Sequence, residues 1–154
     1  QVAGGVTPGI LGNDHPSIAP YSVYATADRP LIIAVGNDRQ FRSTVTVLGI
    51  PGIADDERFA TNTARVAHRE LVRTLLEEQL ATRGADHWYT ALTAVGVPSG
   101  PINDIATAFT LATDLDLHPV VTVDGSDVPF VANPLRMSKT PPTYRLAPSR
   151  VPGQ

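Results

Sequence analysis

The residues of this chain best suited to chemistry lie in one short loop, Gly12–Tyr21, with the sequence Gly-Asn-Asp-His-Pro-Ser-Ile-Ala-Pro-Tyr. An amide, a carboxylate and an imidazole follow one another there, at Asn13, Asp14 and His15. A stiff polar loop with these groups is a good candidate for a flap over a ligand. The alternative is an Asx-turn, in which Asp14 and His15 only satisfy nearby backbone groups.

The shape of this loop follows from its prolines and its glycine. Pro16 and Pro20 disfavour the helical conformation for the residues that precede them, His15 and Ala19. Gly12 allows a positive φ or a close approach of the backbone to another group. The loop is therefore expected to be a shaped, non-helical entry to the first strand.

Three other groups of polar residues were weighed as metal ligands. Asp55–Glu57 is a run of three acidic residues, which we interpret as a solvated helix start. Asp114, Asp116 and His118 alternate with apolar residues, and we interpret them as a solvated strand edge. His68 falls on the apolar face of a predicted helix and is expected to be a packed, hydrogen-bonded histidine. No metal site is predicted.

Composition limits the class of protein. The 154 residues are 42% hydrophobic and 18% charged, which fits one globular domain with a modest core. The net charge is −3 without a basic patch, so nucleic acid is not an expected partner. No apolar run approaches the roughly 20 residues of a membrane-spanning helix. The absence of cysteine suits a reducing compartment, and we expect a cytoplasmic chain with no membrane partner.

Periodicity predicts an α/β (α+β) small domain with antiparallel hairpins, about four helices and a proline-rich C-terminal tail. The expected hairpins pair Tyr21–Thr26 with Leu31–Val35 and Val120–Asp124 with Val128–Ala132. Leu31–Val35 is apolar on both faces and should be an interior strand. Val97–Pro101 is expected to be a stiff loop. Four helices are expected. The first begins at Asn37 or Asp38, and the second runs from about Thr63 to Thr82. The third begins at Asp86 and the fourth at Asn103 or Asp104.

Five segments, taken in order, resemble family III CoA-transferases. This is the group of carnitine and bile-acid CoA-transferases, formyl-CoA transferase and α-methylacyl-CoA racemase. The segments are Gly12–Tyr21, Ile33–Phe41, Asp56–Asn62 with Arg65-Val66, Gly96–Asp104, and Asn133–Arg136 through Thr140–Pro142.

The resemblance implies that the chain matches only the C-terminal part of longer proteins. In the family a large N-terminal domain carries most of the coenzyme A site and an aspartate that attacks the acyl-CoA thioester, forming a mixed anhydride and then an aspartyl-CoA thioester. We therefore expect no catalytic residue in this chain, and neither Asp14 nor Asp38 is assigned as the nucleophile. The expected substrates are an acyl-CoA and a carboxylic acid, with no metal.

The resemblance also implies an organisation of the chain. Residues 1–11 are expected to link to a missing N-terminal domain, 12–132 to form the small domain, and 133–154 to return over the large domain. Family members form interlocked dimers, so a homo-oligomer is expected.

In the family the loop at Gly12–Ser17 borders the active site, and in formyl-CoA transferase it is a glycine-rich flap. Asn13 and His15 are therefore the first candidates, with Asp14, for residues that position substrate or exclude water. The racemase branch carries Val-Gly-Ala-x-Glu-Pro-x-Phe where this chain has Val35–Phe41, without Glu-Pro and one residue shorter. CoA transfer is therefore favoured over α-proton exchange. The alternatives are a racemase-like fragment or a non-catalytic remnant that binds acyl-CoA or a partner.

Overall fold

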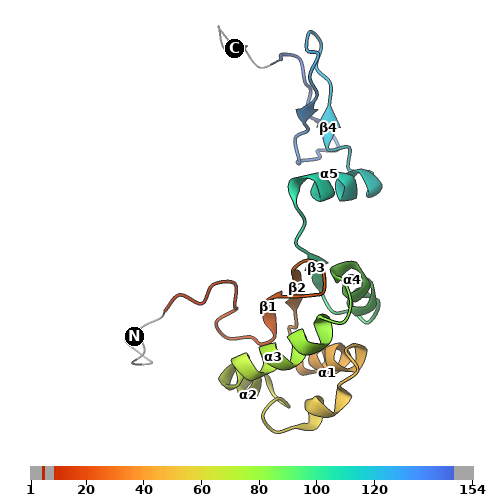
Figure 1. Cartoon of the computed structure of the whole chain (residues 1–154). Helices are drawn as coiled ribbons and strands as arrows, with labels where there is room; N and C mark the ends of the chain where they lie inside the picture. Colours follow the sequence, from red (N-terminus) through yellow and green to blue (C-terminus); the bar gives the residue numbers. More distant parts are fainter. Residues whose placement is uncertain (1–4, 6–8, 148–154) are drawn as a thin grey trace. The chain divides into compact units, whose positions relative to one another are not determined.

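The computed structural model describes residues 5 and 9–147 of the chain, which is drawn in Figure 1. Contacts divide the chain into two compact units, Gln1–Ile102 and Asn103–Gln154. This division falls inside 12–132, and the expected division into functional domains stays a prediction. Most of the expected linker and residues 148–154 of the expected return segment lie outside the described residues.

A three-stranded antiparallel sheet forms the centre of the first unit. β1 (Tyr21–Tyr24) and β2 (Leu31–Ala34) form the predicted hairpin, and β2 is the predicted interior strand. The third strand, β3 (Ser99–Pro101), pairs with β2 on its other side, where the sequence had indicated only a loop. Its edge position explains how a strand can contain Pro101, since an edge strand need not supply every ladder N–H.

The two faces of this sheet are covered unequally. One face is buried against the helices and carries Ser22, Tyr24, Leu31 and Ile33. The other carries Tyr21 and Ile32, each 39% exposed, beside three half-buried residues. We call this second side the open sheet face; it consists of Tyr21, Val23, Ile32, Ala34 and Gly100. An interior strand as apolar as β2 was expected to be covered on both faces.

Helix α1 (Asp38–Val47) follows the sequence prediction closely. The Asn37 side chain caps it by accepting from the Gln40 N–H at 2.9 Å. Phe41 and Val45 are buried, and Gly49, with φ of 79°, follows the end of the helix. A short 3-10 helix, η1 (Pro51–Asp55), comes next.

The single long helix predicted from Thr63 to Thr82 is wrong, because the chain bends at His68. It forms α2 (Asn62–Ala67), capped by Thr61, and then α3 (Arg69–Leu80). His68 has φ of −111°, and its Nδ1 lies 2.9 Å from the Ala64 carbonyl oxygen. The imidazole thus competes for a carbonyl of the helix, and it is exposed instead of packed on an apolar face.

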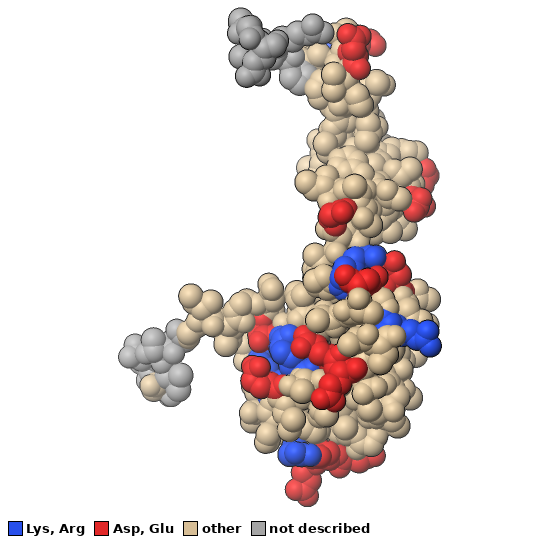
Figure 2. Space-filling view, viewed as in Figure 1, with Lys and Arg blue, Asp and Glu red and all other residues tan. Residues whose placement is uncertain are grey.

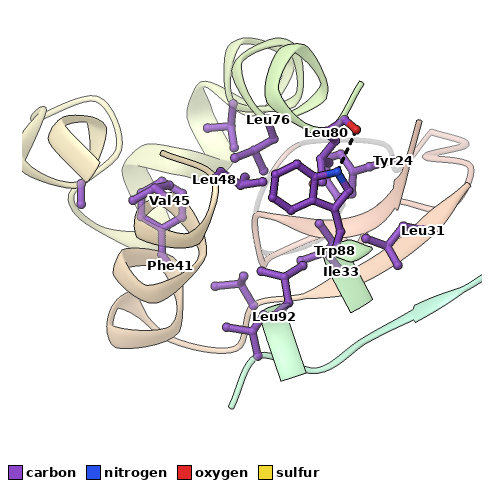
Figure 3. Close-up of a cluster of buried hydrophobic side chains, with 14 of the residues drawn as sticks. Tyr24, Leu31, Ile33, Phe41, Val45, Leu48, Leu76, Leu80, Trp88 and Leu92 are labelled. Carbon is purple, nitrogen blue, oxygen red and sulfur yellow. Dashed lines mark hydrogen bonds between the residues drawn. The ribbon is translucent and has the colours of Figure 1, made fainter. Parts of the chain in front are cut away.

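Helix α4 (Ala85–Ala94) completes the core of the first unit. Asp86 does not cap it; the Ala85 N–H donates instead to Asp28 at 2.7 Å. Trp88 is buried in this core, and its indole N–H donates to the Leu80 carbonyl oxygen at 2.9 Å. Figure 3 shows the indole surrounded by apolar side chains from the sheet and from α1, α3 and α4.

Arg65 on α2 is fully buried and joins three parts of the first unit. Its guanidinium donates to the carbonyl oxygens of Ala19 at 2.7 Å and Phe59 at 2.8 Å, and to Oδ1 of Asp38 at 2.7 Å. It also lies 4.3 Å from the centre of the Phe41 ring. The Arg65 guanidinium therefore holds together the loop 12–20 (the entry loop), the turn before α2 and the start of α1.

The second unit contains one helix and the second predicted hairpin. Helix α5 (Ile105–Asp114) is capped by Asp104, which accepts from the Thr107 N–H at 2.7 Å. Strands β4 (Val120–Val121) and β5 (Phe130–Val131) pair antiparallel. The expected strand edge at 114–118 is wrong: Asp116 and His118 have positive φ and form a turn after α5.

The second unit has almost no core of its own. Among its described residues only Val123 is buried, and α5 buries none of its side chains. Residues 132–147 contain no helix or strand. In the described part of the chain, no helix is long and apolar enough to cross a membrane.

Replacement of Arg65 by alanine is expected to lower the free energy of unfolding by about 3–5 kcal/mol, because two buried carbonyl oxygens and Asp38 lose their partner. Chemical denaturation measures this change. Arg42→Ala is the matched control: its ion pair with Asp55 is exposed, so a loss of about 0–1 kcal/mol is expected. Equal losses in the two variants would contradict the role assigned to Arg65.

Candidate functional site

The loop 12–20 closes on the start of β1. The His15 N–H donates to the Tyr21 carbonyl oxygen at 3.0 Å, and the Asp14 N–H donates to Leu11 at 3.1 Å. Gly12 takes a φ of 60°, which glycine adopts without strain. The His15 ring stacks on Tyr21 with 5.1 Å between ring centres and 23° between planes.

His15 and Asp14 behave differently within this loop. Nδ1 of His15 accepts from the Ser17 backbone N–H at 3.2 Å, so His15 satisfies a local group. Asp14 instead reaches across to α3, as described below. Asn13 is exposed and makes no hydrogen bond within the described part of the chain.

Two side chains from the helices hold the middle of the loop. Asn62 accepts from the Ala19 N–H at 3.2 Å and donates to the Ser17 carbonyl oxygen at 2.9 Å. Arg69 donates to the Pro16 carbonyl oxygen at 3.3 Å. The loop is therefore bound to α2 and α3 through its main chain, and this segment is not a free glycine-rich flap.

Arg73 on α3 anchors the loop at Asp14. Its Nη2 donates to Asp14 Oδ1 at 2.7 Å and to Ser22 Oγ at 3.0 Å. Its Nη1 donates to the Val23 carbonyl oxygen at 2.9 Å and lies 3.3 Å from Glu77 Oε1. Asp14 is thus tied to the same guanidinium that holds β1.

The electrostatics keep Asp14 ionised. Burial alone would raise the pKa of Asp14, but the hydrogen bond with Ser22 and the positive charges of Arg73 and Arg69 outweigh it, so the pKa lies below its usual value. Burial also raises the pKa of the Tyr24 hydroxyl, whose ring lies 4.9 Å from the Arg73 guanidinium. Asp14 is therefore a charged anchor that ties the loop to α3.

The anchoring side chains form one row along α2 and α3, and the sequence interpretation missed this row. No role was assigned to Arg69 or Arg73 from the sequence. Their spacing of three or four positions from one another and from Asn62 was the available signal, since such residues share a helix face. The row consists of Asn62, Arg65, Arg69 and Arg73.

Three other acidic side chains, Asp38, Asp55 and Asp56, are also paired with arginine. Asp38 binds Arg65, and Asp55 lies 2.9 Å from Arg42. Hydrogen bonds from Arg58 lower the pKa of Asp56 to about 2. Over the described residues, no three or more His, Cys, Asp or Glu side chains are placed to hold a metal. Figure 2 shows acidic and basic side chains next to one another on the face of the first unit in view.

The model of CoA-transferase family III matches residues 1–152. The chain belongs to this family. It is 45% identical over 142 residues to a succinate–glutarate CoA-transferase of Agrobacterium fabrum, a match that covers 87% of this chain and 34% of that protein. It is 35% identical over 136 residues to an acetyl-CoA:oxalate CoA-transferase of Acetobacter aceti, covering 88% of this chain and 34% of that protein.

A protein of known structure has a similar fold over nearly the whole of this chain. A CAIB/BAIF family protein from Brucella suis superposes with a TM-score of 0.83 at 39% identity, over 97% of this chain and 39% of that chain. The chain thus spans about a third of the length of the curated relatives that it matches.

Replacement of Asp14 by asparagine should destabilise the chain by about 1 kcal/mol at neutral pH, because the ion pair with Arg73 ends near the surface, where solvent screens it. The pKa of Asp14 is depressed in the folded state, so its contribution is full above the usual value of 3.8 and disappears as pH falls through the folded-state pKa. Urea unfolding measured between pH 7 and pH 3 should therefore show that the difference in free energy of unfolding between the two proteins disappears as the pH falls. Asp55→Asn serves as control, and a pH-independent difference for Asp14→Asn would contradict the charged anchor.

Proposed function

We propose that this chain is the C-terminal portion of a CoA-transferase that moves CoA between an acyl-CoA and a carboxylic acid. The observation that carries the proposal is the 45% identity to a succinate–glutarate CoA-transferase over 142 residues. Membership of the family supports it. We expect the protein to act in the cytoplasm, because a chain without cysteine needs no oxidising compartment.

The proposed chemistry is covalent catalysis by a carboxylate. An aspartate oxygen attacks the thioester carbonyl, and the C–S bond breaks. The CoA thiolate departs, and the donor acyl group remains on the aspartate as a mixed anhydride. The thiolate then attacks the aspartyl carbonyl and releases the donor acid as a carboxylate. The acceptor carboxylate attacks the resulting aspartyl-CoA thioester, the C–S bond breaks, and the CoA thiolate leaves a second mixed anhydride, between the acceptor and the aspartate. The thiolate then attacks the acceptor's carbonyl carbon in this anhydride, which forms the new acyl-CoA and releases the aspartate as a carboxylate.

We propose that the nucleophilic aspartate lies outside this chain. A carboxylate that is held in an ion pair with arginine is a weaker nucleophile than an unpaired one, because the pairing stabilises its negative charge. Asp14 is bound to Arg73, and Asp38 is bound to the buried Arg65, each at 2.7 Å. These ion pairs support a structural role for both carboxylates, and the short span of the chain relative to its relatives fits a nucleophile located elsewhere.

The proposed acceptors are short dicarboxylic acids. The two relatives described above are named for succinate, glutarate and oxalate, which all carry two carboxylates. Glutarate and succinate are the first acids to test, because the relative named for them has the higher identity of the two.

The second unit is proposed to complete a larger assembly. Its described residues bury only Val123, whereas Leu115, Val131 and Leu135 are 59–70% exposed. So many exposed apolar residues favour a further protein surface that packs on them. We propose that the remainder of a longer chain covers them, within a homo-oligomer.

The 154-residue chain alone should show no CoA transfer from succinyl-CoA to glutarate, whereas the longer protein should transfer CoA. Asp14→Asn and Asp38→Asn should leave the chemical step of the longer protein active, because neither carboxylate is the proposed nucleophile. Chromatography that detects glutaryl-CoA measures the activity of the short chain and of the longer protein with its variants. Turnover by the short chain that disappears with either substitution would contradict the proposal.

Hydrogen exchange should distinguish the two units. In the isolated chain, amides of α5 and the β4–β5 hairpin should exchange much faster than those of β2 and α3, because they lack a buried core. In the longer protein the same amides should become protected, while those of β2 stay unchanged. Equal protection of α5 in both forms would show that no other surface covers it.

A further inference from the structure

The open sheet face contains a shallow apolar hollow that the family assignment does not explain. Neither Tyr21 nor Ile32 is covered within the first unit, although β2 has the composition of a strand buried on both sides. The hollow beside them has a volume of about 310 Å³. It is lined by Ile32, Ala34, Pro98, Ser99, Gly100 and Pro101.

His15 lies at one end of this face. Its ring stacks on Tyr21, and Tyr21 is the direct cross-strand partner of Ala34, which lines the hollow. Residues that face each other across an antiparallel pair point to the same side of the sheet. The phenol ring with its stacked imidazole therefore lies on the same side of the sheet as Ala34, at the edge of the hollow.

Local hydrogen bonding determines which nitrogen of His15 carries the proton. A backbone N–H can only donate, so the contact from Ser17 at 3.2 Å makes Nδ1 the acceptor. In a neutral imidazole the proton must then be on Nε2. Nε2 makes no hydrogen bond within the described part of the chain, so its N–H is available as a donor.

The negative charge of Asp14 would repel an anion bound beside His15 if the carboxylate were not paired. Its carboxylate is instead bound to Arg73 at 2.7 Å, and the same guanidinium fixes β1 through the Val23 carbonyl oxygen. The pair thus offsets the negative charge beside His15 and holds the loop to the strand on which His15 stacks.

We propose that His15 is a substrate-binding residue that donates an Nε2–H hydrogen bond to the free carboxylate of a short dicarboxylic acid or its mono-CoA ester. The alkyl chain of the substrate lies on the open sheet face, toward the hollow. Asp14 and Arg73 are positioning residues for this contact. The inference rests on the proposed function, which supplies the dicarboxylate.

Two substitutions separate the two nitrogens of the imidazole. A glutamine side chain places an amide N–H near the position of Nε2, whereas asparagine reaches only the position of Nδ1. In the longer protein, kcat/KM for glutarate should therefore stay close to the unaltered value in His15→Gln. It should fall about 10- to 100-fold in His15→Asn, through loss of a hydrogen bond to a charged group. His118→Asn, an exposed histidine in the second unit, is the matched control.

A spectroscopic measurement tests the tautomer independently of turnover. Nitrogen-15 NMR of histidine-labelled chain should show His15 in a single neutral tautomer with the proton on Nε2. Calorimetric binding of glutarate to the longer protein should give the same order of variants as the kinetics. Both measurements remain informative if the unaltered protein transfers no CoA, a result that would contradict only the proposed function.

Either of two outcomes would overturn the inference itself. One is a His15 ring protonated on Nδ1 or present as a mixture of tautomers. The other is glutarate binding that is as strong in His15→Asn as in the unaltered protein, or as weak in His15→Gln as in His15→Asn. Unchanged thermal unfolding of the two variants confirms that the order reflects binding and not misfolding.

Discussion

The first unit depends on a guanidinium that is buried at a position where an apolar side chain would be expected. Arg65 is completely inaccessible to solvent, and its cost of desolvation is offset by two carbonyl oxygens, one carboxylate and the face of Phe41. Because its partners come from three separate segments, no one of them can shift without leaving a buried polar group unsatisfied. The entry loop thereby acquires a fixed position relative to α1 and the sheet.

A second arginine extends the same principle to the surface. Arg73 binds Asp14 on one side and the main chain of β1 on the other, so the candidate loop and the strand that follows it move as one body. The carboxylate most tempting as a nucleophile is therefore an anchor, and its neighbour His15 is the group left with a free donor. Attachment through its main-chain carbonyl oxygens further fixes this loop against α2 and α3.

Local patterns predicted the elements whose determinants lie close together in sequence. The predicted start of α1 at Asn37 was correct, because a helix cap depends on residues within one turn. Long-range determinants were missed. The strand Ser99–Pro101 exists only through pairing with β2, and the bend at His68 and the burial of Arg65 follow from packing. The anchor of Asp14 is separated from it by 59 positions, which no local pattern reveals.

The placement of Trp88 has a consequence for optical studies of this chain. It is the only tryptophan of the sequence, and it lies in the core of the first unit, with its N–H bound to the Leu80 carbonyl oxygen. Its emission therefore follows the melting of that core alone. In the second unit the corresponding chromophore is Tyr144, whose hydroxyl accepts from the Asn133 N–H at 2.6 Å. The other three tyrosines, Tyr21, Tyr24 and Tyr89, belong to the first unit, so tryptophan emission follows the first unit selectively whereas tyrosine emission mixes the two units.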